Sequence, residues 1–152
     1  MSGIVFRRAR EADLPAIVAM LADDELGKLR EDTGLPLAQG YLAAFEAIDS
    51  DPNQYLAVAT EGDAIVGTLQ LTFIAGLSRK GALRGQIEAV RVAASHRSKG
   101  VGQKMFEWAI DECRARGCIL VQLTTDRDRL DAHRFYDRLG FEPSHLGYKL
   151  KL

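Results

Sequence analysis

The chain has 152 residues, which is the length of one ordinary domain and enough to bury a single hydrophobic core. Its 20 basic and 21 acidic residues leave a formal net charge of −1, without the basic excess that is typical of dedicated nucleic-acid binders. No stretch reaches the roughly 18 apolar residues of a membrane span, and the N-terminal apolar run is too short for a signal peptide. We therefore expect one domain over residues 1–152 that works in the cytoplasm, without nucleic acid or membrane as a partner.

The first half of the chain predicts strands and helices in a simple order. A strand is expected over residues 4–9, and Asp13 can cap a helix in which Leu14, Ile17, Val18 and Leu21 recur at helical spacing. A second helix is expected over residues 35–48. The acidic run Asp23-Asp24-Glu25 between the two helices is most simply a solvated loop.

The next segments predict an antiparallel meander of three strands. Residues 54–60 and 64–74 form two of them around a hairpin turn at residues 61–63. A basic connection containing glycines then leads into a strand over residues 83–93.

The last third predicts a parallel crossover. A helix begins at Val101 and ends near Gly117, and residues 118–124 are almost continuously apolar, as in a buried strand. Strand, turn, helix and strand in this order make a right-handed crossover with parallel strands. A short helix over residues 130–139 and a final strand over residues 148–152 complete a mixed α/β fold with a sheet of six to seven strands and flanking helices.

Few residues favour a metal or disulfide site. Cys113 and Cys118 are the only cysteines, and the three histidines are scattered. We expect both thiols to be reduced and packed in the core, and we expect no metal.

The stretch Arg97-Ser98-Lys99-Gly100-Val101-Gly102 lies at the turn from a strand into a helix. Glycines at such a turn let backbone N–H groups approach a phosphate, and the helix N-terminus adds partial positive charge. A P-loop is excluded because its Gly-Lys-Ser/Thr string is missing, and a dinucleotide fingerprint is excluded because position 105 is Met. A pyrophosphate cradle of another kind is indicated, with an ordinary basic turn as the alternative.

The stretch resembles Arg/Gln-x-x-Gly-x-Gly/Ala, the acetyl-CoA loop of the GCN5-related N-acetyltransferases (GNAT). Residues 132–141, Ala-His-Arg-Phe-Tyr-Asp-Arg-Leu-Gly-Phe, resemble a second signature of this superfamily, and residues 8–17 resemble a common opening. The chain is therefore identified as a member of the GNAT superfamily. One departure is Arg129, since many relatives carry Asn there and use it to contact the pantetheine arm of the cofactor.

The resemblance implies direct transfer of an acetyl group from acetyl-CoA, as co-substrate, to an amine. The pantetheine arm would lie between two diverging strands and pair with the free strand edge, and the loop amides would hold the pyrophosphate. A Cβ at Gly100 or Gly102 would fill the space that the phosphate needs. The residues expected to bind the cofactor are Val90, Arg91, Val92, Arg97, Ser98, Lys99, Gly100, Val101, Gly102 and Gln103.

The resemblance also implies an acid and a base. Tyr136 matches the tyrosine that protonates the departing thiolate, and Glu88 matches a glutamate that takes the proton of the acceptor ammonium through water. Alternation along the strand places residues 86, 88, 90 and 92 on one face, so that Glu88 points to the same side as Val90 and Val92. The alternatives are a structural ion pair of Glu88 with Arg84 or Arg91, and His133 as the base.

The sequence leaves the acceptor open between a small molecule and a protein amine. The acidic run at residues 23–25 would suit a cationic amine, although it also fits a solvated loop. A non-catalytic acyl-CoA sensor on the same fold is the alternative function. A homodimer stays possible because dimers are common among relatives.

Overall fold

The structure is a computed structural model that describes residues 3–152. Its elements follow one another in the order β1 (Val5–Arg8), η1 (Glu11–Asp13), α1 (Leu14–Ala22), α2 (Gly27–Arg30), α3 (Gln39–Asp49), β2 (Gln54–Glu61), β3 (Ala64–Ala75), α4 (Ser78–Gly81), β4 (Leu83–Val92), η2 (Ala94–His96), α5 (Val101–Ala115), β5 (Leu120–Gln122) and α6 (Leu130–Arg138). The mixed α/β class predicted from the sequence is confirmed.

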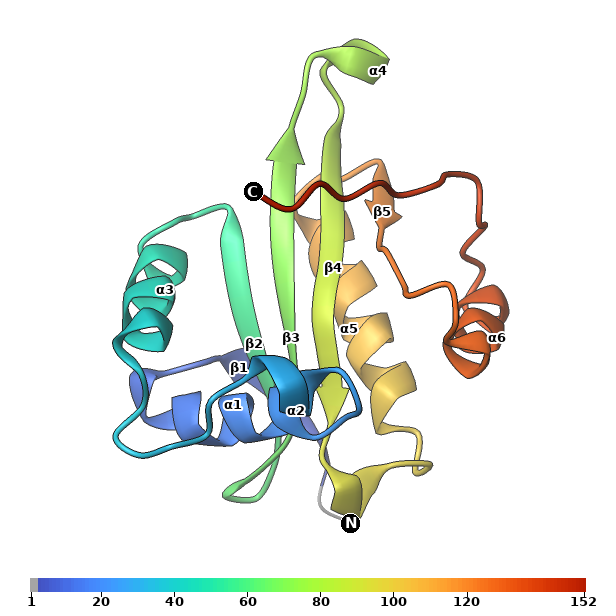
Figure 1. The fold of residues 1–152 in the computed structure, drawn as a ribbon. Coiled ribbons are helices and arrows are strands. Elements are labelled where there is room, and N and C mark those ends of the chain that lie inside the picture. Colours follow the sequence, from blue (N-terminus) through green and yellow to red (C-terminus); the bar gives the residue numbers. More distant parts are fainter. Residues whose placement is uncertain (1–2) are drawn as a thin grey trace.

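The strands form one mixed sheet in the order β1-β2-β3-β4-β5 (Figure 1). The first three pairings are antiparallel and the last is parallel, so the predicted meander and the predicted crossover through α5 are both confirmed. The sheet has five strands rather than the expected six to seven.

The C-terminal segment accounts for the difference in strand number. Residues 141–152 run as an extended coil, and no strand forms at residues 148–152. Apolar and polar residues alternate in this segment, but the apolar side chains face solvent, with Leu146, Tyr148, Leu150 and Leu152 between 80% and 117% exposed. A strand needs a neighbouring edge with which to exchange backbone hydrogen bonds, and among residues 3–152 this segment has none.

The sheet carries a separate hydrophobic core on each face. One core joins Leu69, Leu71 and Ile87 to the α5 side chains Met105 and Phe106. The core on the other face joins Val58 to Leu14 and Ile17, so that α1 covers this face. Helix α5 lies so close to β4 that a Cβ added at Gly85 would come within 2.3 Å of the Cys113 Sγ. The close packing fixes the end of α5 against the start of β4.

The strands β4 and β5 separate after a short pairing. Arg84, Gly85 and Gln86 pair with Leu120, Val121 and Gln122, and β4 then continues to Val92 with no partner on that side among the described residues. Strand β5 is shorter than the predicted 118–124 and is half-buried rather than buried, because it is an edge strand with one neighbour. Within residues 3–152, no helix has the length and apolar character that crossing a membrane requires.

Candidate active site

The turn between β4 and α5 presents unused backbone donors. Ser98 and Gly100 have φ of 62° and 80°, and Gly100 directly precedes the 15-residue helix α5. Within residues 3–152, the N–H groups of residues 98–102 donate to no protein acceptor, and no side chain caps the helix. Several converging amides at a helix N-terminus suit an anion, so the turn has the donors that a pyrophosphate would need.

The two cations of this turn are in different situations. The Arg97 guanidinium donates to the Val92 carbonyl at 3.2 Å and pairs with Asp23 at 3.0 Å, which ties the turn to the end of α1. Lys99 is exposed and has no ion pair among the described residues. Arg97 therefore positions the turn, whereas Lys99 is free to meet an anion.

The protein itself leaves room for a small side chain at both glycines, so the expectation that a Cβ would fill the space of the phosphate stays a prediction. A Cβ at Gly100 would meet nothing within 4 Å, and one at Gly102 would lie 3.8 Å from Phe135 and 3.9 Å from Val92, which is ordinary contact. Gly100 is favoured because its φ of 80° is left-handed. A side chain at Gly102 would enter the gap between β4 and α6, so only a side chain longer than a methyl group would obstruct it.

A β-bulge in β4 overturns the expected alternation. Thr68 pairs with Arg91 and Gln70 with Glu88, so that Leu69 opposes both Ala89 and Val90, and Ala89 has a φ of 54°. The extra residue changes the face of every side chain after it. Ile87, Val90 and Val92 pack on the α5 side, whereas Glu88 pairs with Gln70, one residue away from the core side chain Leu69 and hence on the opposite face. The prediction that Glu88 shares a face with Val90 and Val92 is wrong.

Glu88 lies among hydrogen-bonding side chains on the face opposite α5. The Thr72 hydroxyl lies 3.3 Å from the Glu88 Oε1 and 3.0 Å from the Gln54 Oε1, so that the two acceptors share its single hydrogen. In the part of the chain that the structure describes, Glu88 pairs with neither Arg84, which donates to Gln122, nor Arg91. The exposed carboxylate is therefore available to an acceptor, and the ion-pair alternative is wrong.

Tyr136 lies on α6 in an aromatic cluster with Phe106, Phe135 and Phe141, at ring-centroid distances of 5.6 to 6.2 Å. Burial raises the pKa of Tyr136, while the charges of Arg129 and Arg91 act in the opposite direction. Among residues 3–152, its hydroxyl has no hydrogen-bond partner. The Tyr136 hydroxyl is thus protonated and can donate its hydrogen to a ligand, and the aromatic rings fix the position of the side chain.

Sequence reasoning missed an ionic cluster that joins three distant segments. Asp24, between α1 and α2, pairs with Arg91 on β4 at 3.0 Å and with Arg129, which directly precedes α6, at 3.5 Å. The Gly27 N–H also donates to Asp24. Asp24 is therefore not part of a solvated loop. Its 105-residue separation from Arg129 left no local signal in the sequence.

His133, the alternative candidate for the base, contacts the loop before α6. Its Nε2 lies 3.0 Å from the Asp126 carbonyl and joins α6 to the preceding loop.

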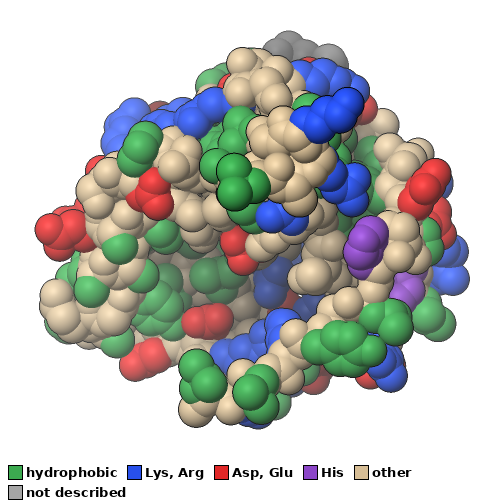
Figure 2. Space-filling model, turned by 90° about the horizontal axis from the view of Figure 1, so that it is seen from above, with side chains coloured by type: hydrophobic (Ala, Val, Ile, Leu, Met, Phe, Trp, Pro, Cys, Tyr) green, Lys and Arg blue, Asp and Glu red, His purple; other side chains and the backbone are tan. Residues whose placement is uncertain are grey.

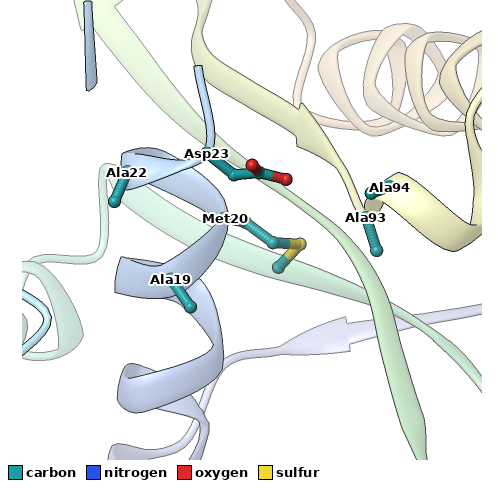
Figure 3. A pocket seen from close by; sticks show the side chains of 6 residues that line it. All are labelled: Ala19, Met20, Ala22, Asp23, Ala93 and Ala94. Carbon is teal, nitrogen blue, oxygen red and sulfur yellow. The ribbon is translucent and has the colours of Figure 1, made fainter. Parts of the chain in front are cut away.

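A groove of about 440 Å³ lies between α1 and residues 93–94, which follow β4 (Figure 3). It is lined by Ala19, Met20, Ala22, Asp23, Ala93 and Ala94, and so contains none of the predicted catalytic or cofactor-binding residues.

Cys113 and Cys118 are free thiols, as expected, and the pKa of Cys113 is raised to about 12, chiefly by burial. Cys113 is fully buried and Cys118 is only partly so. Within residues 3–152, no group of three or more His, Cys, Asp or Glu side chains is placed to hold a metal ion.

The fold and these features define a class of acyl-group transferases. The profile of the Acetyltransferase (GNAT) family matches residues 18–141. The chain is 32% identical over 110 residues to the aminoalkylphosphonate N-acetyltransferase of Salmonella typhimurium, covering 72% of this chain and 71% of that protein. It is 31% identical over 96 residues to the streptothricin acetyltransferase of Streptomyces lavendulae, covering 63% of this chain and 48% of that protein.

Among solved structures, a transcriptional regulator from Bacillus halodurans is similar with a TM-score of 0.96 and 46% identity, covering 99% of this chain and 100% of that chain. The chain belongs to the GNAT family of acetyltransferases. It is an acyltransferase with N-acetyltransferase activity, and acetyl-CoA is the co-substrate of its family.

Proposed function

We propose that the protein transfers an acetyl group from acetyl-CoA directly to the amine of a small molecule. The observation that carries the proposal is the unpartnered edge of β4 after Gln86, which runs from Glu88 to the free amides of the β4–α5 turn. Both relatives reported above bear the names of enzymes that acetylate small molecules, which supports a small-molecule acceptor.

In this proposal the turn and the strand edge position the co-substrate. The amides of residues 98–102, with Gln103 and the charge of Lys99, bind the pyrophosphate, and Arg97 keeps the turn in place. The backbone of Val90, Arg91 and Val92 pairs with the pantetheine arm as an added strand would. A backbone N–H near Val90 polarises the thioester carbonyl as attack proceeds.

Glu88 and Tyr136 manage the protons at opposite ends of the reaction. Glu88 accepts a proton from the acceptor ammonium, directly or through water, which frees the nitrogen lone pair. The nitrogen–carbon bond then forms and the carbon–sulfur bond breaks. Tyr136 donates its proton to the departing sulfur, so that the products are the acetylated amine and the CoA thiol.

Two measurements test the proposal. Calorimetry should show acetyl-CoA binding that is weakened at least tenfold in Gly102→Asp, whose carboxylate would enter the gap beside Phe135 and Val92. Gly147→Asp is the matched control, since a Cβ at Gly147 meets nothing within 4 Å. Release of CoA thiol with a library of amines separates the enzyme from a non-catalytic acyl-CoA sensor, which would bind acetyl-CoA without releasing thiol. Unchanged binding in Gly102→Asp would remove the turn from the site.

The cellular location, the metal requirement, the partners and the oligomeric state of the enzyme stay predictions. We expect the enzyme to work in the cytoplasm, without a metal and without nucleic acid or membrane as a partner. Light scattering on a sizing column would determine whether it forms the homodimer that the sequence leaves open.

A further inference from the structure

We infer that the acceptor carries an acid group close to its amine, and that Arg91 and Arg129 bind this acid group. The inference rests on the proposed function and names the class of its substrate: small amino acids in the broad sense, with a carboxylate or a phosphonate as the acid. The shared chemistry is an anionic oxygen group a few bonds from a primary amine.

The first argument is the charge of the cluster around Asp24. One carboxylate faces two guanidinium groups, at 3.0 Å from Arg91 and 3.5 Å from Arg129, so the cluster has an excess positive charge. Arg91 is 21% exposed and thus partly shielded, whereas Arg129 is 42% exposed and reaches solvent. An anion entering here would meet a net attraction with less screening than at a fully exposed surface.

The second argument is the number of unused hydrogen-bond donors. A guanidinium has five N–H groups in a planar fork that matches carboxylate and phosphonate oxygens. Arg91 forms an ion pair with Asp24 and donates to the Val90 carbonyl, and its Nε is buried without an acceptor among residues 3–152. Arg129 donates only to Asp24 within the same residues. The protein supplies fewer acceptors than the two side chains can use, and an acid group would supply more.

The third argument is the position of these cations relative to the base. Arg91 and Glu88 pair with Thr68 and Gln70, which are same-face neighbours on β3, so both side chains lie on the face opposite α5. Same-face neighbours on a strand are about 7 Å apart. A carboxylate and a guanidinium at this spacing suit a zwitterion, with the ammonium group at Glu88 and the acid at Arg91.

The fourth argument is the position of Tyr136. Arg129 directly precedes α6, the helix that carries Tyr136, and the shared partner Asp24 brings Arg91 to the same place. The charges of both arginines favour ionisation of the Tyr136 hydroxyl. An acid group bound to these cations would thus be held at the start of the helix that carries the group proposed to protonate the sulfur. Seen from above, the molecule is hollowed, and basic and acidic side chains both lie in the hollow (Figure 2).

The same two arginines could instead stabilise the departing thiolate, and the two roles predict different kinetics. A role in binding the acid group discriminates between acceptors and acts on KM and kcat/KM. A role at the sulfur lowers kcat by the same factor for every acceptor, because every acceptor releases the same thiolate.

The experiment compares acceptors that differ in the acid group: 2-aminoethylphosphonate, β-alanine and propylamine, with wild type, Arg129→Gln and Arg129→Lys. Arg134→Gln is the matched control, since Arg134 lies on α6, is 64% exposed and, among residues 3–152, pairs only with Asp131. We expect wild type to favour at least one acid-bearing amine over propylamine at least tenfold in kcat/KM. Arg129→Gln should lower kcat/KM for that amine about 10- to 100-fold and for propylamine less than threefold, as expected for loss of a charge-assisted contact. Arg129→Lys should retain part of the preference, and the Kd for acetyl-CoA should stay within twofold.

The comparison of 2-aminoethylphosphonate with β-alanine identifies whether a phosphonate or a carboxylate is the preferred acid group. Equal kcat/KM for propylamine and both acidic amines, or an equal loss for all three in Arg129→Gln, would overturn the inference and leave the enzyme intact. An absence of thiol release with every amine, in a protein that binds acetyl-CoA, would instead refute the proposed function and the inference with it.

Discussion

The contact between Gly85 and Cys113 predicts how the protein responds to a single added methyl group. An ideal Cβ at Gly85 would lie 2.3 Å from the Cys113 Sγ and 3.3 Å from its Cβ, and Cys113 is fully buried. Real Cβ atoms do not approach so closely, so Gly85→Ala must push α5 away from β4. Overpacking of this kind costs about 1–3 kcal/mol of unfolding free energy.

Removing the sulfur should relieve the clash. Cys113→Ala alone should cost about 1–2 kcal/mol, because it leaves a cavity in the core. In the double variant the new methyl group takes the place of the sulfur, and the remaining Cβ–Cβ distance of 3.3 Å needs only a small shift. The loss in the double variant should therefore be smaller than the sum of the single losses by at least about 1 kcal/mol.

Urea unfolding of the four proteins measures this coupling, with Gly76→Ala as the control because a Cβ at Gly76 meets nothing within 4 Å. A Gly85→Ala variant as stable as wild type, or strictly additive losses, would refute the close packing of the end of α5 on the start of β4.

Three further results are expected. Tyr136→Phe should lower kcat about 10- to 100-fold with little change in KM for acetyl-CoA. The wild-type rate should decline above the raised pKa of Tyr136, and the variant should lose this decline. Wild-type turnover in the variant would exclude Tyr136 as the acid. Glu88→Gln should lower kcat and flatten the pH–rate profile, whereas an unchanged profile would mean that another group takes the proton. Asp13 accepts two hydrogen bonds from Arg7, at 2.7 and 3.1 Å, and the Arg7 guanidinium lowers the pKa of Asp13. This pair therefore contributes stability that is complete above about pH 4 and is lost as pH falls through the lowered pKa of Asp13. Asp13→Asn should cost about 1.5–3 kcal/mol of unfolding free energy at pH 7 and less near pH 2. Urea unfolding at both pH values would measure the difference.

Most of the fold follows from signals that lie close together in the sequence. Helical spacing predicts α1 from residues 14–21, and alternating or continuous apolar runs predict β2, β3 and β4 within one or two residues of their bounds. The glycine-containing turn and the apolar run after α5 predict the parallel crossover. Each of these signals spans only a few residues, so it can be recognised without knowledge of contacts between distant segments.

The features that sequence reasoning missed depend on contacts between distant segments. The bulge at Ala89 adds one residue to β4 relative to β3, and nothing in the local composition marks a residue with left-handed φ that is not glycine. The short helix α2 and the pairing of Asp24 with Arg91 and Arg129 depend on how α1 and α6 approach β4. The family motifs predicted the catalytic candidates, but the side of the sheet on which Glu88 lies required the three-dimensional register.

The bulge also limits which residues position 89 can carry during evolution. At the present chain length, simple alternation without the bulge would turn Arg91 toward the apolar side chains of α5, while Val92 would face the acceptor. A buried guanidinium without a counter-ion is far more damaging than most point substitutions. Members of the lineage that kept this chain length should therefore carry at position 89 a residue that tolerates a left-handed φ, and β-branched residues should be rare there.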